Sequence, residues 1–116
     1  MARLVVDGTD LVVRLTPAEM LVARRREVRV PRTDVRHVVV EPDRWRGLRG
    51  VRRSGRWLPD RFCVGEWRHP DGRDFGAVRG RGPVVVAGLA PSAPFERLTV
   101  SVPDAESVVR AIRQER

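Results

Sequence analysis

The chain has 116 residues, of which 41% are hydrophobic and 33% are charged. This length fits one domain, and this balance excludes both a disordered tail and a bundle of membrane-spanning helices. No apolar run approaches the roughly 18 residues of a spanning helix, and no secretory signal begins the sequence. The single cysteine, Cys63, can form no internal disulfide. We therefore expect a cytoplasmic protein of one domain, residues 1–116, without a transmembrane segment.

The first third of the chain predicts short strands and one helix. Apolar runs at 4–6 and 11–15 flank Asp7-Gly8-Thr9-Asp10, which is typical of a hairpin turn. Thr16-Pro17-Ala18-Glu19 predicts a helix start, because threonine caps, proline suits the first position and glutamate completes a capping box. This helix, near 17–25, is expected to bury one side through Met20, Leu21, Val22 and Ala23. Two further strands are predicted at 28–31 and 35–41, the second with alternating faces.

The rest of the chain predicts a loop, more strands and a terminal helix. Residues 42–59 contain several glycines and prolines, so we expect mostly loop, with one helical turn near 45–48. His69-Pro70-Asp71-Gly72 predicts a hairpin between strands at 61–69 and 73–79. Strands follow at 83–89 and 96–102, the latter with Leu98, Val100 and Val102 inward and Arg97, Thr99 and Ser101 outward. The C-terminal helix, near 103–115, carries an apolar stripe of Ala105, Val108, Val109 and Ile112.

The predicted fold class is therefore mainly β (β+α), an antiparallel roll or barrel of about seven short strands that the C-terminal helix closes. Several motifs occur in order: Val28-Arg29-Val30-Pro31 with Val35-Arg36, Trp45-Arg46-Gly47-Leu48-Arg49-Gly50, Gly72-Arg73-Asp74-Phe75 with Ala77-Val78, Gly82-Pro83-Val84-Val85-Val86, and Phe95-Glu96-Arg97-Leu98-Thr99-Val100-Ser101-Val102-Pro103-Asp104. Through them residues 11–115 resemble the bacterial pleckstrin-homology-like (PH-like) domains of small proteins from high-GC Gram-positive bacteria. The resemblance implies two roughly orthogonal sheets, a closing helix and no known enzyme chemistry.

The positive charge of the chain is concentrated in one segment. There are 23 basic residues, all arginine, against 15 acidic ones, which gives a net charge of +8. Six of the arginines lie between Asp43 and Asp60 with no acid among them, interleaved with tryptophans. Arginine and tryptophan are the residue types of interface hot spots, of membrane headgroup layers and of base stacking. The candidate binding residues are Arg44, Trp45, Arg46, Arg49, Arg52, Arg53, Arg56 and Trp57.

These residues leave three binding functions and one structural role open. The first is a non-catalytic module that docks a protein partner through 44–59 or through a sheet edge, which could also produce homo-oligomers. An anionic-lipid surface, with the protein peripheral to the membrane, is the alternative, and nucleic acid is a further one. The structural interpretation makes the tryptophans a lid on the sheet. In eukaryotic PH domains the first hairpin loop binds anions with basic residues, whereas Asp7 and Asp10 make this loop acidic.

Catalytic and metal sites find little support in the sequence. His37 and His69 have no second histidine or cysteine at metal-ligand spacing. Cys63 lies between apolar neighbours and is expected to be buried, and its pairing with His69 as nucleophile and base lacks an evident third group. Phe62, Phe75 and Phe95 are expected in the core. We predict a protein that is not an enzyme and that holds no cofactor.

Overall fold

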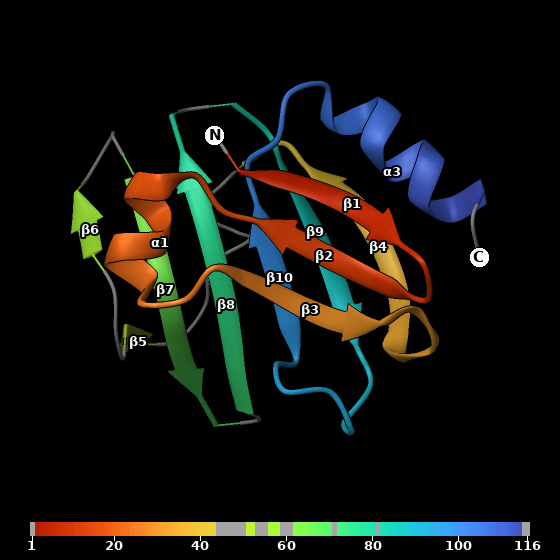
Figure 1. Ribbon diagram of the computed structural model, residues 1–116, viewed down its shortest axis with the longest axis horizontal. Coiled ribbons are helices and arrows are strands. Elements are labelled where there is room, and N and C mark those ends of the chain that lie inside the picture. The colour runs from red at the N-terminus through yellow and green to blue at the C-terminus, as the bar shows by residue number, and fades with distance from the viewer. Residues whose placement is uncertain are drawn as a thin grey trace.

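Two β-sheets cross face to face and enclose the main core (Figure 1). The computed structural model describes residues 2–43, 51–52, 56–58, 62–70, 72–80 and 82–114. The small sheet has the order β1-β2-β3, and the large sheet has the order β4-β9-β10-β8-β7-β5, with β6 also paired to β7. The strands are β1 (Arg3–Asp7), β2 (Asp10–Arg14), β3 (Glu27–Pro31), β4 (Val35–Glu41), β5 (Val51–Arg52), β6 (Arg56–Leu58), β7 (Phe62–His69), β8 (Gly72–Arg79), β9 (Val84–Leu89) and β10 (Arg97–Val100).

Two helices lie at opposite ends of this sandwich. Helix α1 (Pro17–Ala23) begins with the predicted capping box, in which Thr16 and Glu19 each bond the backbone N–H of the other. It packs on β7, whereas α3 (Ala105–Gln114) packs against β4 and β1 (Figure 1). Ala105, Val109 and Ile112 are buried in α3, as its apolar stripe predicts. Neither of these described helices has the length and apolar character needed to cross a membrane.

The mainly β fold class is confirmed, and most strand pairs are antiparallel, but one pair is parallel. Gly8, with φ of 63°, turns the first predicted hairpin, and β7 and β8 form the second. The last strand, β10, inserts between β8 and β9, which follow one another in the chain. β8 and β9 run in opposite directions. Because β10 is antiparallel to β9, it is parallel to β8. This insertion is a tertiary event, so hairpin signals alone could not predict it.

The structure adds two features that the predictions for the middle of the chain did not contain. Within 42–59 it describes 42–43, 51–52 and 56–58, and β5 and β6 there extend the hydrogen-bonded ladder at the edge of β7. The helical turn predicted near 45–48 lies outside the described residues. In β4 the expected alternation, with Val35 and Val38 on opposite faces, is broken by a bulge at Arg36, so that both are buried. A bulge inserts one unpaired residue and shifts the alternation by one position.

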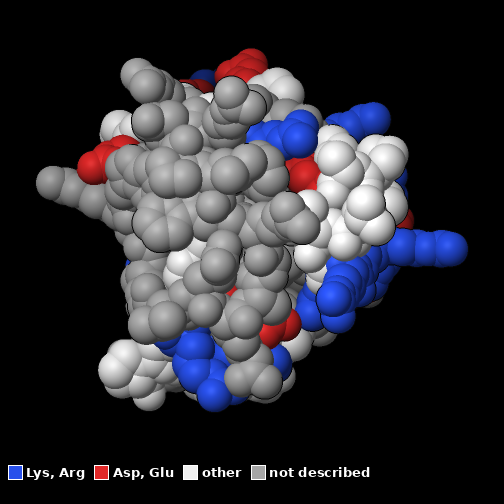
Figure 2. Space-filling model, turned by 90° about the vertical axis from the view of Figure 1, so that its left-hand side faces the viewer, with Lys and Arg blue, Asp and Glu red and all other residues white. Residues whose placement is uncertain are grey.

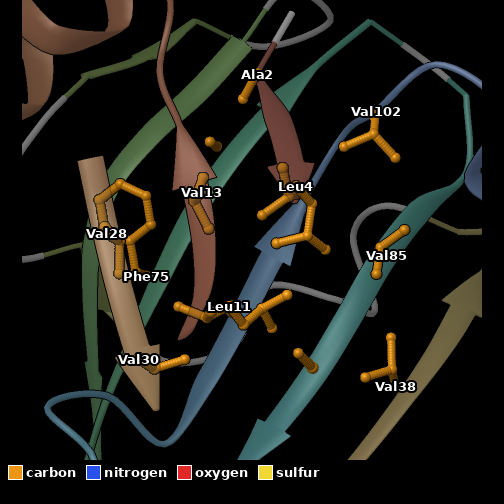
Figure 3. Close-up of a cluster of buried hydrophobic side chains, with 14 of the residues drawn as sticks. Ala2, Leu4, Leu11, Val13, Val28, Val30, Val38, Phe75, Val85 and Val102 are labelled. Atoms are coloured by element: carbon orange, nitrogen blue, oxygen red, sulfur yellow. The ribbon is translucent and has the colours of Figure 1, made fainter. Parts of the chain in front are cut away.

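The main core lies between the two sheets. Leu4, Leu11 and Val13 of the small sheet face Phe75 and Val85 of the large one (Figure 3). The opposite side of the large sheet is buried as well, with Cys63, Trp67, Val78, Val84 and Val86 forming a second apolar cluster. Thr99 and Ser101, predicted to face outward, point away from Leu98 and Val100 but are also buried. The large sheet is therefore covered on both sides.

Candidate binding site

The predicted arginine and tryptophan segment is placed only in part. Arg44, Trp45, Arg46, Arg49 and Arg53 lie outside the described residues. The backbones of Arg52, Arg56 and Trp57 belong to β5 and β6, which pair with β7. This places both strands on the β7 flank of the large sheet, the side of the molecule on which α1 packs (Figure 1).

Helix α1 lies on this flank in an unexpected orientation. Its only charged side chain, Glu19, is 1% exposed, whereas Leu21 is 81% exposed. The prediction that Leu21 is buried with its apolar neighbours is therefore wrong, although Met20 and Ala23 do pack against the core. Residues two positions apart in a helix point in nearly opposite directions, so inward Glu19 forces Leu21 outward.

The inward position of Glu19 is fixed by specific contacts. Its Oε1 accepts a hydrogen bond from the Thr16 backbone N–H at 2.9 Å. Its Oε2 lies 4.0 Å from Arg79 Nε and has no hydrogen-bond partner among the described residues. A buried carboxylate loses solvation worth several kcal/mol, and an exposed leucine forgoes about 1.5–3 kcal/mol of burial. This helix orientation is therefore not the one that side-chain hydrophobicity favours.

The outer side of α1 combines apolar and basic side chains. We call it the α1 surface: Pro17, Ala18, Leu21, Arg24 and Arg26, all of which are exposed. Leu21 lies three or four residues from Pro17, Ala18 and Arg24, so these four side chains share one helix face. Figure 2 faces the β7 flank and shows described arginines beside uncharged residues on its right-hand side, where α1 lies. Within the described part of the chain, Arg24 and Arg26 have no acidic partner, so their charges remain available to a ligand.

Arg25, between them, turns inward and fixes the end of the α1 surface. Its Nη2 donates to Glu66 Oε1 at 3.1 Å. Its guanidinium carbon lies 5.6 and 5.3 Å from the ring centroids of Phe75 and Phe95, within the range of cation–π contacts. Both phenylalanines are buried as predicted. Of the three consecutive arginines, the outer two therefore face solvent and the middle one anchors the segment.

The described sheet edges offer less for docking. α3 packs against β1 and β4, the edge strands of their respective sheets, and Arg113 donates to the Val38 carbonyl oxygen. The other edge of the small sheet, β3, carries exposed Glu27 and Arg29 and ends at Pro31. Charges and proline are common protections of an edge strand against strand addition.

The first hairpin is acidic, as predicted, but its charges are paired. Arg29 donates to Asp10 at 3.1 Å and to Asp7 at 3.2 Å, and it also contacts Glu27. These hydrogen bonds raise the pKa of Arg29 above its usual value, and the bond to Asp10 has a larger effect than the bond to Asp7. Arg14 is a second partner of Asp7. The hairpin is thus part of an ion-pair network on the outer face of the small sheet.

The histidines and the cysteine do not form a catalytic pair. Cys63 and His69 lie six residues apart on the same strand, β7, which separates them by roughly 20 Å. Cys63 is buried as predicted. His69 Nε2 lies 2.9 Å from Asp74 Oδ1 and 3.9 Å from Glu96 Oε2, and the His69 and Asp74 side chains are buried. His37 lies on β4 with its ring over Gly88.

Comparisons with protein families, curated proteins and solved structures found no match. The PH-like resemblance therefore rests on the sequence motifs and remains a prediction. In the part of the chain that the structure describes, no group of three or more His, Cys, Asp and Glu side chains is placed to hold a metal ion. The α1 surface was missed by sequence reasoning, and the capping-box role of Glu19 was the only signal for it.

Proposed function

We propose that this protein is a non-catalytic binding module that docks an acidic partner protein on its β7 flank, through the α1 surface. The observation that carries the proposal is the orientation of α1, with Glu19 buried and Leu21 81% exposed. In natural proteins, residues whose placement conflicts with the usual rules of burial, such as a buried charge beside an exposed leucine, are concentrated at functional sites. A partner with an apolar notch and nearby carboxylates would cover Leu21 and pair with Arg24 and Arg26.

One further feature supports this flank. The strands β5 and β6, which carry part of the predicted arginine and tryptophan segment, lie beside β7. A partner on α1 would therefore be close to the predicted segment as well.

A protein is favoured over a lipid surface because one leucine and two free arginines hold a bilayer weakly, about 1 kcal/mol for each arginine near the surface. A shaped protein pocket gains the full burial of the leucine.

The test is affinity capture from cells that make the protein, with three variants compared. Leu21→Ser and the double variant Arg24→Asn/Arg26→Ser should each reduce capture of one protein species by at least about tenfold, since burial of a leucine contributes about 1.5–3 kcal/mol. Asparagine is chosen because Arg24 has φ of 58°, a conformation that asparagine tolerates. The matched control, Arg3→Ser/Arg110→Ser, removes two exposed arginines elsewhere and should leave capture unchanged.

Direct binding assays separate the other ligand classes. The protein is mixed with vesicles of neutral lipid, with vesicles containing anionic lipid, and with duplex and single-stranded DNA at low salt. The proposal predicts no binding that depends on Arg24 and Arg26 in any of these mixtures. It is wrong if both α1 variants keep full capture while folded, or if anionic vesicles bind the wild type and not the arginine variant.

A further inference from the structure

The segment that joins α1 to β3 carries both cations of the α1 surface, and one acid of β7 holds this segment. Arg24, the C-cap of α1, and Arg26 are exposed, whereas Arg25 between them turns toward the sheet. In Figure 1 the segment crosses in front of β7 on its way to β3. Glu66 of β7 accepts a hydrogen bond from Arg25 Nη2 through its Oε1 at 3.1 Å. The directions of Arg24 and Arg26 therefore depend on a residue that lies 41 positions after Arg25.

Glu66 is itself held in place, so that it can serve as a fixed anchor. Its side chain is 13% exposed, and its second oxygen, Oε2, lies 3.6 Å from Arg73 Nη1 of β8. Arg73 is fixed in turn, because its Nη2 donates to the Pro94 carbonyl oxygen at 3.2 Å. Salt screens a partly buried ion pair less than one at the open surface. One carboxylate thus joins a guanidinium of the α1–β3 segment to a guanidinium of the large sheet.

Two buried rings complete the anchor. The guanidinium carbon of Arg25 lies 5.6 Å from the ring centroid of Phe75 and 5.3 Å from that of Phe95. The guanidinium carbon of Arg73 lies 5.4 Å from the Phe95 centroid as well. Contacts of this length are within the cation–π range. Glu66 and Phe95 therefore each contact both arginines, and the four side chains form a closed cluster.

This cluster bears on docking because ordered side chains bind at a smaller entropy cost than a segment that must first become ordered. We propose that Glu66 is a positioning residue for docking at the α1 surface. By anchoring Arg25, it holds Arg24 and Arg26 in the arrangement that the carboxylates of the partner meet. Glu66 is not itself part of the α1 surface, and its role in docking rests on the proposed function.

The sign of the effect separates positioning from charge. Glu66→Ala removes a negative charge, so electrostatics alone would strengthen binding of an acidic partner, mainly through a faster association. Loss of positioning has the opposite result, because it weakens binding, mainly through a faster dissociation. Glu27→Ala is the matched control: Glu27 directly follows Arg26, is exposed and pairs with Arg29, outside the cluster.

Binding is measured with the protein species that the wild-type chain captures from cells, purified and immobilised for a kinetic assay. Glu66→Ala should weaken binding by about three- to tenfold, with a higher dissociation rate constant. Glu66→Gln keeps an acceptor for Arg25 without the charge and should lose less. Glu27→Ala should bind as tightly as the wild type or more tightly. The positioning role is wrong if Glu66→Ala binds like Glu27→Ala.

Hydrogen exchange of the full chain, followed by NMR, measures positioning without a partner. The Arg24 and Arg25 amides both donate to the Met20 carbonyl oxygen, and in Glu66→Ala they should exchange at least about threefold faster. Unchanged exchange of the β9 and β10 amides shows that the variant is folded. A wild type that captures no protein refutes the proposed function, and the docking role of Glu66 with it. If the wild type docks but Glu66→Ala docks equally well, or keeps wild-type exchange at Arg24 and Arg25, only the role of Glu66 is refuted.

Discussion

Besides its buried apolar stripe, α3 is joined to the edge of the large sheet by one arginine, whose contribution can be tested directly. Arg113 donates two hydrogen bonds to the carbonyl oxygen of Val38, from Nε at 3.1 Å and from Nη2 at 2.8 Å. Val38 is 1% exposed, so its carbonyl depends on these donors or on water that must enter beside the helix. Arg113→Ala removes both donors at once.

The expected cost follows from this geometry. Hydrogen bonds to charged groups contribute about 1.5–3 kcal/mol, and an acceptor left unpaired loses a similar amount. Because Arg113 is itself exposed and water can replace it in part, we expect Arg113→Ala to lower the free energy of unfolding by about 1–2 kcal/mol. For a domain of this size, that is a fall in Tm of roughly 4–8 °C. Arg113→Lys keeps one donor and should lose about half as much.

Urea denaturation followed by circular dichroism measures these differences. Arg110→Ala is the matched control, because Arg110 lies on the same helix, is exposed and makes no side-chain hydrogen bond or ion pair within the described part of the chain. It should change the free energy of unfolding by less than about 0.5 kcal/mol. If Arg113→Ala and Arg110→Ala unfold at the same urea concentration, Arg113 does not hold α3 to β4.

Two further predictions concern a turn and a buried thiol. Gly72→Ala should destabilise the fold by about 1–3 kcal/mol in thermal melts, because φ is 151°, a backbone conformation that L side chains rarely adopt. Gly82→Ala, whose Cβ would meet nothing within 4 Å, should change stability little, and equal effects would contradict the reasoning. Cys63, 2% exposed, should resist a thiol-reactive dye in the native protein and react fully in denaturant. Rapid native labelling would show that the thiol is accessible.

Much of the fold could be predicted because its signals are local. The capping box at Thr16 and Glu19 predicted the start of α1, and the turn residues around Gly8 and Gly72 predicted two hairpins. The parallel pairing of β10 with β8 could not be predicted, because it depends on which gap the last strand enters. The burial of Thr99 was missed for a related reason, since alternation shows which face a residue is on and not whether that face is covered.

The candidate site was less predictable, and α1 shows why. The sequence predicted a helix that buries one side through Met20, Leu21, Val22 and Ala23, with Glu19 in a capping box. The capping box keeps Glu19 near Thr16, and Arg79, 60 residues later in the sequence, lies 4.0 Å from Glu19 Oε2 without hydrogen-bonding it. The surroundings of the helix therefore include residues far away in the sequence, which local patterns do not reveal.

The docking that we propose on the β7 flank depends on the orientation of α1. The rotation that buries Glu19 near Arg79 turns Leu21 outward beside Arg24. Arg25 is held by Glu66 and by the rings of Phe75 and Phe95, so the helix end cannot turn independently. Replacement of Glu19 by an apolar residue would remove a buried carboxylate, but it would also remove the capping-box acceptor of the Thr16 N–H. Arg24 and Arg26 face solvent as arginines ordinarily do, so the outward leucine is the feature on which the proposed docking function rests.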